Sequence, residues 1–127
     1  MTNAHDVKLW HAMSFRDADT MMAWLSAIGF VEHATYRDEQ NQVVHAEWLW
    51  PGGGGIMFGA DTNGTVHNAG GSAAYLISDD PDAVFDRAVA AGATVVRQMA
   101  DQDYGGRSGS VEDPEGNHWS FGSYQPS

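Results

Sequence analysis

Two stretches of the chain place apolar residues at helical spacing, and the segments around them alternate between apolar and polar residues as strands do. Asp17 and Asp80 precede the two helical stretches, where a carboxylate can accept backbone N–H bonds as an N-cap. Gly29 and Gly92 follow them, where glycine can take up the left-handed conformation that ends a helix. The predicted buried stripes are Met21, Met22, Leu25 and Ile28 in the first helix, and Val84, Phe85, Ala88 and Ala91 in the second.

One predicted strand precedes each helix and three follow it. Turns rich in Asp, Gly, Pro and Asn, at 38–42, 51–55 and 113–116, separate the strands that come after the helices. The pattern therefore predicts the order β-α-β-β-β twice. The predicted strands are 9–15, 30–37, 43–50 and 56–59 in the first half, and 73–77, 94–97, 107–111 and 119–124 in the second.

The two halves carry the same helix-capping aspartate and helix-ending glycine at a constant offset. Asp80 follows Asp17 by 63 residues (80 − 17 = 63), and Gly92 follows Gly29 by the same number (92 − 29 = 63). An offset shared by several elements indicates two related half-domains. We predict one domain over residues 1–127, with a first module at about 7–60, a linker at about 61–71 and a second module at about 72–125.

Composition narrows the class of protein. With 43% hydrophobic residues the chain can bury a core, and with no cysteine it has neither disulfides nor thiolate metal ligands. The net charge of −11 and the scattered cations argue against a nucleic-acid partner. No apolar run is long enough to cross a membrane, so we expect a cytoplasmic protein with no membrane partner. The acidity itself has two interpretations: solubility, or an acidic concavity that attracts cationic small molecules.

The second half contains a motif that is known from one superfamily. Tyr104-Gly-Gly-Arg107, followed by Val111-Glu-Asp-Pro-Glu-Gly-Asn-His-Trp119, resembles the C-terminal signature of the vicinal-oxygen-chelate (VOC) proteins. These include glyoxalase I, bleomycin-resistance proteins and extradiol dioxygenases. The resemblance implies an α+β fold, in which two βαβββ modules form a curved mixed sheet around a ligand cup, usually in a homodimer. It is specific for the fold and much less so for the activity.

The same resemblance implies where a metal ion would be bound. Enzymatic members of the superfamily hold a divalent ion with His, Gln or Glu on the first and last strands of each module. In this chain the four corresponding positions hold Trp10, Met57, Ala73 and Ser120. None of these supplies the imidazole or carboxylate that such an ion prefers. We therefore predict no metal and no other cofactor.

Strand alternation predicts which side chains face the cup. On strand 43–50, His45 and Glu47 share one face, while Trp48 and Trp50 share the other. We place the polar pair toward the ligand and the two tryptophans in the core. The predicted ligand-binding residues are Trp10, Tyr36, His45, Glu47, Met57, Tyr104, Arg107, His118 and Ser120.

Three of these residues have more than one interpretation. Glu47 and His118 are candidate catalytic residues, because a carboxylate and an imidazole can act as acid and base or as ligands of a displaced metal. A simple hydrogen-bonded His–Glu pair in a polar cavity explains them equally well. Arg107 can bind an acidic ligand, or it can pair with the nearby Asp113.

Three functions are compatible with these observations. The first is a metal-free binding protein, similar to bleomycin-resistance proteins, that sequesters a cationic or aromatic small molecule between aromatic walls. The alternative is a glyoxalase-like, metal-dependent lyase, isomerase or dioxygenase that uses non-standard ligands such as His45, Glu47 and His118. The third is a regulatory or scaffold module that acts through its dimer surface.

Overall fold

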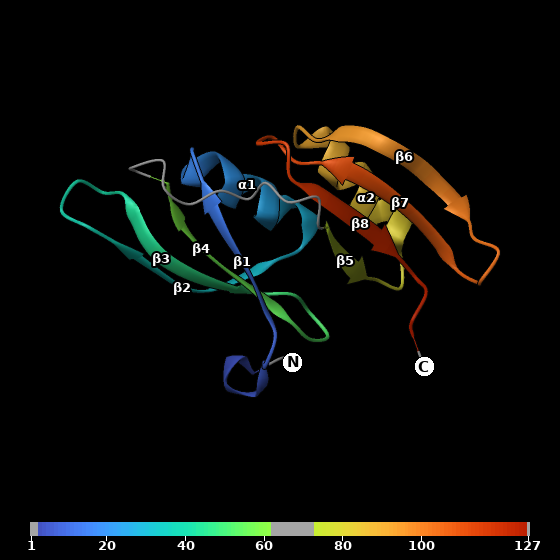
Figure 1. Ribbon diagram of the computed structural model, residues 1–127, viewed down its shortest axis with the longest axis horizontal. Helices are drawn as coiled ribbons and strands as arrows, with labels where there is room; N and C mark the ends of the chain where they lie inside the picture. The colour runs from blue at the N-terminus through green and yellow to red at the C-terminus, as the bar shows by residue number, and fades with distance from the viewer. Residues whose placement is uncertain (1–2, 62–72, 127) are drawn as a thin grey trace. The chain divides into compact units, whose positions relative to one another are not determined.

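The computed structural model describes residues 3–61 and 73–126, which form two compact units on either side of residue 68 (Figure 1). From residue 62 onward the predicted linker 61–71 lies outside the described residues. Unit one contains a short 3-10 helix, η1 (Ala4–Asp6), followed by β1 (Trp10–Phe15), α1 (Ala18–Ile28), β2 (Val31–Arg37), β3 (Val43–Leu49) and β4 (Gly55–Ala60). Unit two contains β5 (Ala73–Ile77), α2 (Pro81–Ala90), β6 (Thr94–Asp101), β7 (Arg107–Glu112) and β8 (His118–Gly122).

Each unit has one four-stranded mixed sheet, which we call sheet one and sheet two. The strand orders are β1-β4-β3-β2 and β5-β8-β7-β6. In both sheets the first pair of strands is parallel and the other pairs are antiparallel. The predicted α+β fold of two βαβββ modules is therefore confirmed.

The predicted repeat extends to the pairing of individual residues. Trp10 pairs with Gly55 in sheet one, and Ala73 pairs with His118 in sheet two, each 63 residues further on. Even the irregularity between Glu32 and Ala34 has its counterpart between Val95 and Arg97. The two sheets are thus copies in register as well as in strand order.

The helix boundaries follow the predicted caps. Asp17 Oδ1 accepts from the Thr20 N–H at 3.1 Å, and Asp80 Oδ1 accepts from the Ala83 N–H at 3.3 Å. The hydrogen bonds to Thr20 lower the pKa of Asp17 below its ordinary value. Gly29 and Gly92 end the two helices with φ of 121° and 120°, a conformation that disfavours other residues.

Two members of the predicted apolar stripes are not buried. Met22 is half-buried, because it lies beside the stripe that Trp24 and Ala18 complete. Ala91 is exposed, because α2 ends at Ala90 and Ala91 is already its C-cap. The other predicted stripe residues are buried as expected.

Two strand ends lie two or more residues from their predicted positions, and the others lie within one residue. β6 continues to Asp101 rather than ending at residue 97, since its hairpin with β7 stays paired as far as Asp101 opposite Arg107. β8 ends at Gly122 rather than at residue 124. Beyond that point Ser123 donates a single backbone bond to the Arg107 carbonyl.

One face of each sheet packs on its helix and forms the core. In sheet one, Ile56 and Phe58 of β4 and Trp48 of β3 are buried. In sheet two, Trp119 and Phe121 of β8 are fully buried, and α2 contacts β6, β7 and β8. Alternate residues point to the opposite side. We call that side the open face of each sheet. No helix of the described residues is long and apolar enough to span a membrane.

Candidate functional site

Five predicted ligand-binding residues of unit one share the open face of sheet one. Met57 of β4 lies between Ala12 of β1 and Glu47 of β3, with which it pairs on either side. Trp10 lies one row away on β1, opposite Gly55. Tyr36 of β2 pairs with His45 of β3. Trp48 and Trp50 are buried on the other side, as predicted, so His45 and Glu47 belong to the open face.

The Trp10 ring lies close to Gly55 of the strand that it pairs with. A Cβ atom at Gly55 would collide with the six-membered ring of Trp10, so glycine is required for the indole to take this position. Trp10 remains partly accessible, whereas Trp24, Trp48, Trp50 and Trp119 are all buried. The open face of sheet one therefore carries one partly accessible indole, and its position depends on the glycine at residue 55.

His45 and Glu47 form the predicted pair. The His45 Nε2 and Glu47 Oε2 atoms are 2.8 Å apart, and the side chains are 43% and 32% exposed. Tyr36 stacks on the His45 ring at a centroid distance of 6.3 Å and an interplanar angle of 18°. One carboxylate oxygen of Glu47 is thus engaged by the imidazole, beside an aromatic surface.

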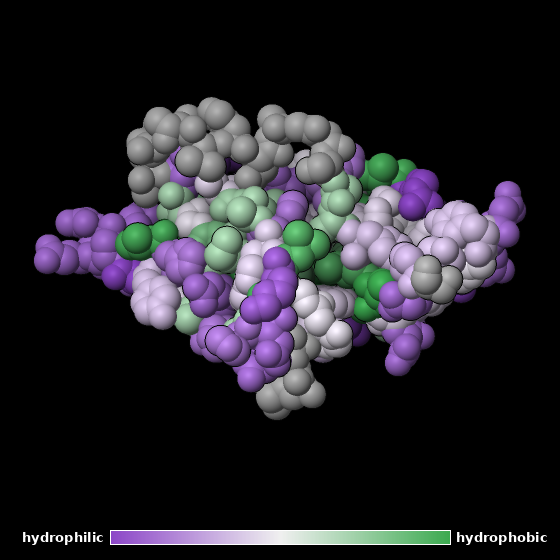
Figure 2. Space-filling model, turned by 60° about the horizontal axis from the view of Figure 1, so that its bottom comes forward, coloured by the Kyte–Doolittle hydropathy of each residue, from purple (hydrophilic) through white to green (hydrophobic). Residues whose placement is uncertain are grey.

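A cavity of about 780 Å³ extends this face at the ends of β2 and β3. Its apolar walls include Val31 and Leu49, which pair with each other in the same row as Gly55 and Trp10. Val31 is among the large apolar side chains that are exposed. Figure 2 shows that hydrophobic residues form green patches among hydrophilic and neutral ones on one face of the molecule. Such a volume lies within the range of about 300–1,000 Å³ that small-molecule sites occupy. The cavity is lined by Asn3, Ala4, Val31, Glu32, His33, Leu49, Trp50, Pro51 and Gly52.

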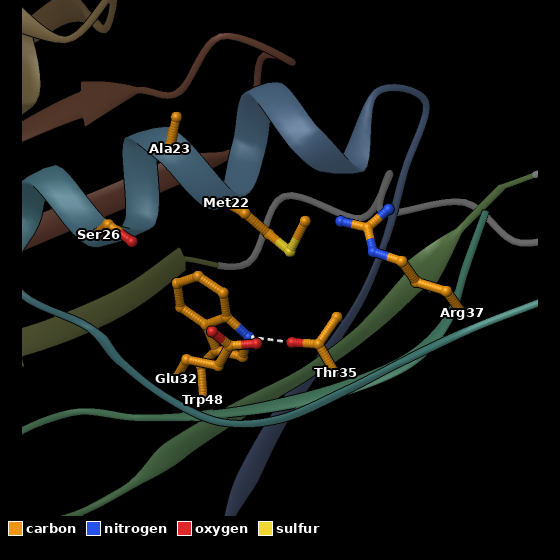
Figure 3. A pocket seen from close by; sticks show the side chains of 7 residues that line it. All are labelled: Met22, Ala23, Ser26, Glu32, Thr35, Arg37 and Trp48. Atoms are coloured by element: carbon orange, nitrogen blue, oxygen red, sulfur yellow. Dashed lines mark hydrogen bonds between the residues drawn. The ribbon is translucent and has the colours of Figure 1, made fainter. Parts of the chain in front are cut away.

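A second pocket of about 340 Å³ lies on the helix side of the same sheet, between α1 and the strands β2 and β3 (Figure 3). Several of its polar groups already have partners. Trp48 Nε1 donates to Thr35 Oγ1 at 3.1 Å, and Arg37 Nη2 donates to Asp19 Oδ1 at 2.7 Å. This pocket is a weaker candidate than the open face. It is lined by Met22, Ala23, Ser26, Glu32, Thr35, Arg37 and Trp48.

The open face of sheet two carries His118 and Ser120. His118 Nε2 lies 3.2 Å from Glu112 Oε2, so its partner is a residue of the neighbouring strand. Ser120 Oγ lies 2.8 Å from Ser110 Oγ, which accepts in turn from Arg97 Nη2 at 3.1 Å. The structure thus gives His118 and Ser120 separate partners in two adjacent rows.

Arg107 has a different environment from the one predicted. Its Nε and Nη2 atoms both donate to the Asp82 carboxylate at 2.9 Å, and Nη1 donates to Asp101 at 3.1 Å. These bonds raise the pKa of Arg107 above its ordinary value and lower that of Asp82. Because Asp82 belongs to the first turn of α2, the guanidinium of Arg107 lies on the helix side of sheet two.

Of the two alternatives for Arg107, the pairing with Asp113 is wrong. The buried Asp113 carboxylate accepts from Trp119 Nε1 at 2.8 Å and from the backbone N–H of Glu115 and Asn117. It organises the tight turn before β8 and leaves no role for the arginine.

Tyr104 and Tyr75 have aromatic or backbone partners in unit two. Tyr104 is exposed and packs edge-on against Tyr124, with 5.1 Å between ring centroids. The Tyr75 hydroxyl donates to the Tyr124 carbonyl at 2.9 Å, and burial raises the pKa of Tyr75. Tyr75 lies on the open face opposite Ser120 and was not among the predicted ligand-binding residues.

Comparison with known proteins identifies the family. Residues 10–121 match the model of the glyoxalase-like domain. The chain belongs to the glyoxalase-like domain family. This VOC-type domain is similar to the crystal structure of TioX from Micromonospora sp. ML1, with 28% identity, a TM-score of 0.72, and coverage of 94% of this chain and 98% of that one.

Other structures show the same fold at lower identity. A glyoxalase/bleomycin resistance protein/dioxygenase family enzyme from Burkholderia phytofirmans is 20% identical, with a TM-score of 0.71, over 89% of this chain and 94% of that one. Among curated sequences, uncharacterized proteins of Mycobacterium bovis and Mycobacterium tuberculosis are 54% identical over 48 residues, 38% of this chain. That alignment covers 32% and 28% of the two relatives.

The metal positions of this glyoxalase-like domain do not fit a divalent ion. Trp10, Met57, Ala73 and Ser120 supply one thioether and one hydroxyl between them, and Ser120 Oγ is already hydrogen-bonded to Ser110. The residues paired with Met57 and Ser120 on the first strands are Ala12 and Tyr75, which are no better suited. Within the part of the chain that the structure describes, no three His, Asp or Glu side chains lie together as a metal site.

Four residues of the open faces escaped the sequence analysis: Tyr75, Arg97, Ser110 and Glu112. One of them had a usable signal. Glu112 and His118 flank residues 113–117 symmetrically, so a hairpin there puts them opposite each other. Arg97 carried no such signal, since a bulge between Val95 and Arg97 sets its register.

Proposed function

We propose that this glyoxalase-like domain binds and sequesters an aromatic, cationic small molecule on the open face of sheet one, without a metal. The observation that carries the proposal is the adjacent placement of three open-face residues: Met57 pairs with Glu47 in one row, and Trp10 lies in the next row on β1, so that an indole and a carboxylate both neighbour the methionine. An indole attracts a cation through its ring face, and a carboxylate does so through its charge. The net charge of −11 favours the same class of ligand over long range.

The neighbouring surface suits the apolar part of such a ligand. Tyr36 and His45 offer a stacked surface beside Glu47, and Met57 is a polarisable residue that adapts to flat rings. The cavity next to Val31 and Leu49 adds apolar room in the row of Trp10. An aromatic body and one positive charge are the features that these side chains recognise together.

The test compares N-methylquinolinium, a cationic aromatic probe, with quinoline, which is neutral at neutral pH. Isothermal titration calorimetry should show the cation binding about tenfold more tightly, because a desolvated cation–π contact and a carboxylate together contribute more than about 1.4 kcal/mol. Equal binding of the two probes, or no binding of either, would contradict the proposal.

Trp10→Leu tests the location of the site. Binding of N-methylquinolinium to the wild type should quench tryptophan fluorescence, and the variant should lose both the quenching and most of the affinity, because the other four tryptophans are buried. Leu9→Ala is a matched control, since the neighbouring Leu9 is 83% exposed. Quenching that survives in Trp10→Leu would place the site elsewhere.

A metal-dependent lyase, isomerase or dioxygenase is the second candidate. It is favoured by the two His–Glu pairs, His45–Glu47 and His118–Glu112, each of which offers an imidazole and a carboxylate. Metal analysis of protein purified without an affinity tag separates the candidates. Stoichiometric metal that disappears in His45→Ala or His118→Ala would support the enzyme, and its absence from all preparations would support sequestration.

We also propose that the protein is a homodimer, as the VOC resemblance implies. Its composition implies a cytoplasmic location. Light scattering after size-exclusion chromatography measures the first directly. A monomer that still binds N-methylquinolinium would show that one chain suffices for the site.

A further inference from the structure

A polar row crosses the open face of sheet two. Arg97 of β6 is paired with Ser110 of β7, and Ser110 is paired with Ser120 of β8. Their side chains are joined by hydrogen bonds, at 3.1 Å from Arg97 Nη2 to Ser110 Oγ and at 2.8 Å between the two hydroxyl oxygens. We call these three residues the Arg97 row.

Arg97 is bound differently from the arginines that stabilise the units. Arg37 and Arg107 each pair with aspartate, whereas no ion pair joins Arg97 to a carboxylate of the described residues. The chain holds 17 Asp and Glu against 6 Lys and Arg, so a carboxylate partner would be easy to supply. Arg97 is exposed, and its one described side-chain partner is a neutral hydroxyl, so no described carboxylate neutralises the guanidinium.

Hydrogen positions make the row a set of donors. Arg97 has only N–H donors, so Ser110 Oγ must accept from it. When the Ser110 hydroxyl donates a hydrogen bond to Ser120 Oγ, the hydrogen of the Ser120 hydroxyl is free to point away from Ser110. The guanidinium and the Ser120 hydroxyl then both offer donors to a third group. The partner that satisfies such a set is an oxyanion.

The fold does not need this row. At the equivalent positions of sheet one, 63 residues earlier, stand Ala34, Glu47 and Met57, in the same register. That sheet forms without a cation or a hydroxyl at any of the three positions. A structural role is therefore a poor explanation for the Arg97 row.

Few negative charges oppose an anion at this place. The described carboxylate in the adjacent row is Glu112, and it is held by His118 at 3.2 Å. Tyr75, opposite Ser120, presents a neutral phenol whose hydroxyl donates to the Tyr124 carbonyl.

We propose that Arg97 and Ser120 bind the oxyanion group of a small molecule, a carboxylate or a phosphoryl group, on the open face of sheet two. The planar fork of the guanidinium suits two oxygens of either group, and the Ser120 hydroxyl contributes a further bond. The site is independent of cation binding on sheet one, so either can fail without the other.

The experiment uses the full chain with two probes, inorganic phosphate and acetate, at constant ionic strength. Binding is followed by amide NMR shifts of the wild type and by the thermal midpoint across the millimolar range of each anion. Shifts should appear at residues 97, 110 and 120. Arg97→Gln should weaken binding by about tenfold or more, since bonds to charged groups contribute about 1.5–3 kcal/mol, and Ser120→Ala should weaken it less. A stronger response to phosphate identifies a phosphoryl ligand, and one of equal size for acetate identifies a carboxylate.

Arg87→Gln is the matched control. It removes the same charge from an exposed position on α2 in the same unit, so general electrostatic effects should be equal in the two variants. Loss of binding in Arg97→Gln with retention in Arg87→Gln supports the site. Equal responses of the two variants, or no shift at the Arg97 row in the wild type, overturn it. Because the NMR experiment uses wild-type protein, the proposal remains testable even if Arg97→Gln folds poorly.

Discussion

The two sheets have the same scaffold and opposite chemistry on their open faces. The central row of sheet one reads Ala12, Met57, Glu47 and Ala34, and the equivalent row of sheet two reads Tyr75, Ser120, Ser110 and Arg97. One row carries a carboxylate and the other a guanidinium at neighbouring positions. The pairing register, the capping aspartates and the helix-ending glycines are nevertheless retained.

The difference shows which positions the fold constrains. Phe58 and Phe121 are equivalent and both buried, as are Ile56 and Trp119, because these positions must fill the space beneath a helix. The open-face residues between them point away from the core and differ in charge between the two sheets. Function in this duplicated domain is therefore expected where the two copies differ.

The largest predicted difference concerns two buried indoles. Trp119 Nε1 donates to the Asp113 carboxylate at 2.8 Å, whereas Trp48 Nε1 donates to the Thr35 hydroxyl at 3.1 Å. Bonds to charged groups contribute about 1.5–3 kcal/mol and neutral ones about 1 kcal/mol. Trp119→Phe should therefore lower the free energy of unfolding more than Trp48→Phe does, which urea denaturation measures. The reverse order would show that the turn 113–116 does not depend on this bond.

Gly55→Ala should damage the open face of sheet one specifically. The new Cβ collides with the Trp10 ring, so the indole must move away from its position on β4. We expect a loss of N-methylquinolinium affinity similar to that of Trp10→Leu, with phosphate binding unchanged. Gly122→Ala, which displaces Tyr75 in sheet two, is the counterpart and should leave the cation site intact. If Gly55→Ala kept its full affinity for the cation, the position of Trp10 would not matter for binding.

The ion pairs at the helix starts should differ more modestly. Asp82 receives two bonds from Arg107, and the equivalent Asp19 receives one from Arg37 and is 68% exposed. Since hydrogen bonds from Arg107 lower the pKa of Asp82, its contribution is present above the ordinary carboxyl pKa and is lost as the pH falls through the folded pKa. Asp82→Asn should destabilise more than Asp19→Asn at neutral pH, and the difference should vanish in acid. Urea midpoints at the two pH values check this, and a difference that persists in acid would contradict it.

The smallest effect concerns His11 of β1, whose counterpart in sheet two is Ala74. Burial lowers the pKa of His11, so the folded state resists its protonation. Its contribution is present above the ordinary histidine pKa and is lost as the pH falls through the folded value. His11→Phe should therefore flatten the fall in stability between neutral and mildly acidic pH. An unchanged slope of the thermal midpoint against pH would show that His11 contributes nothing.

The sequence predicts what is determined locally. Asp17, Asp80, Gly29 and Gly92 mark the helix boundaries through contacts within a few residues, and alternation on strand 43–50 correctly places Trp48 in the core. The constant offset then transfers each assignment from one half to the other.

Partners that depend on tertiary contacts were not predictable in this way. Arg107 reaches Asp82 because α2 packs on sheet two, a contact between residues 25 positions apart, whereas proximity in sequence pointed to Asp113. The position of Arg97 opposite Ser110 depends on a bulge that the residue pattern does not reveal. The residue pattern therefore pointed to Arg107, whereas Arg97 is the arginine that the structure places on the open face.

The central claim is that the two open faces prefer opposite charges, and one double titration tests it most directly. N-methylquinolinium and phosphate are each titrated into the wild type, Glu47→Gln and Arg97→Gln. We predict that Glu47→Gln weakens binding of the cation alone and that Arg97→Gln weakens binding of phosphate alone. If either variant weakens both probes equally, or if neither changes anything, the assignment of opposite chemistry to the two sheets is contradicted.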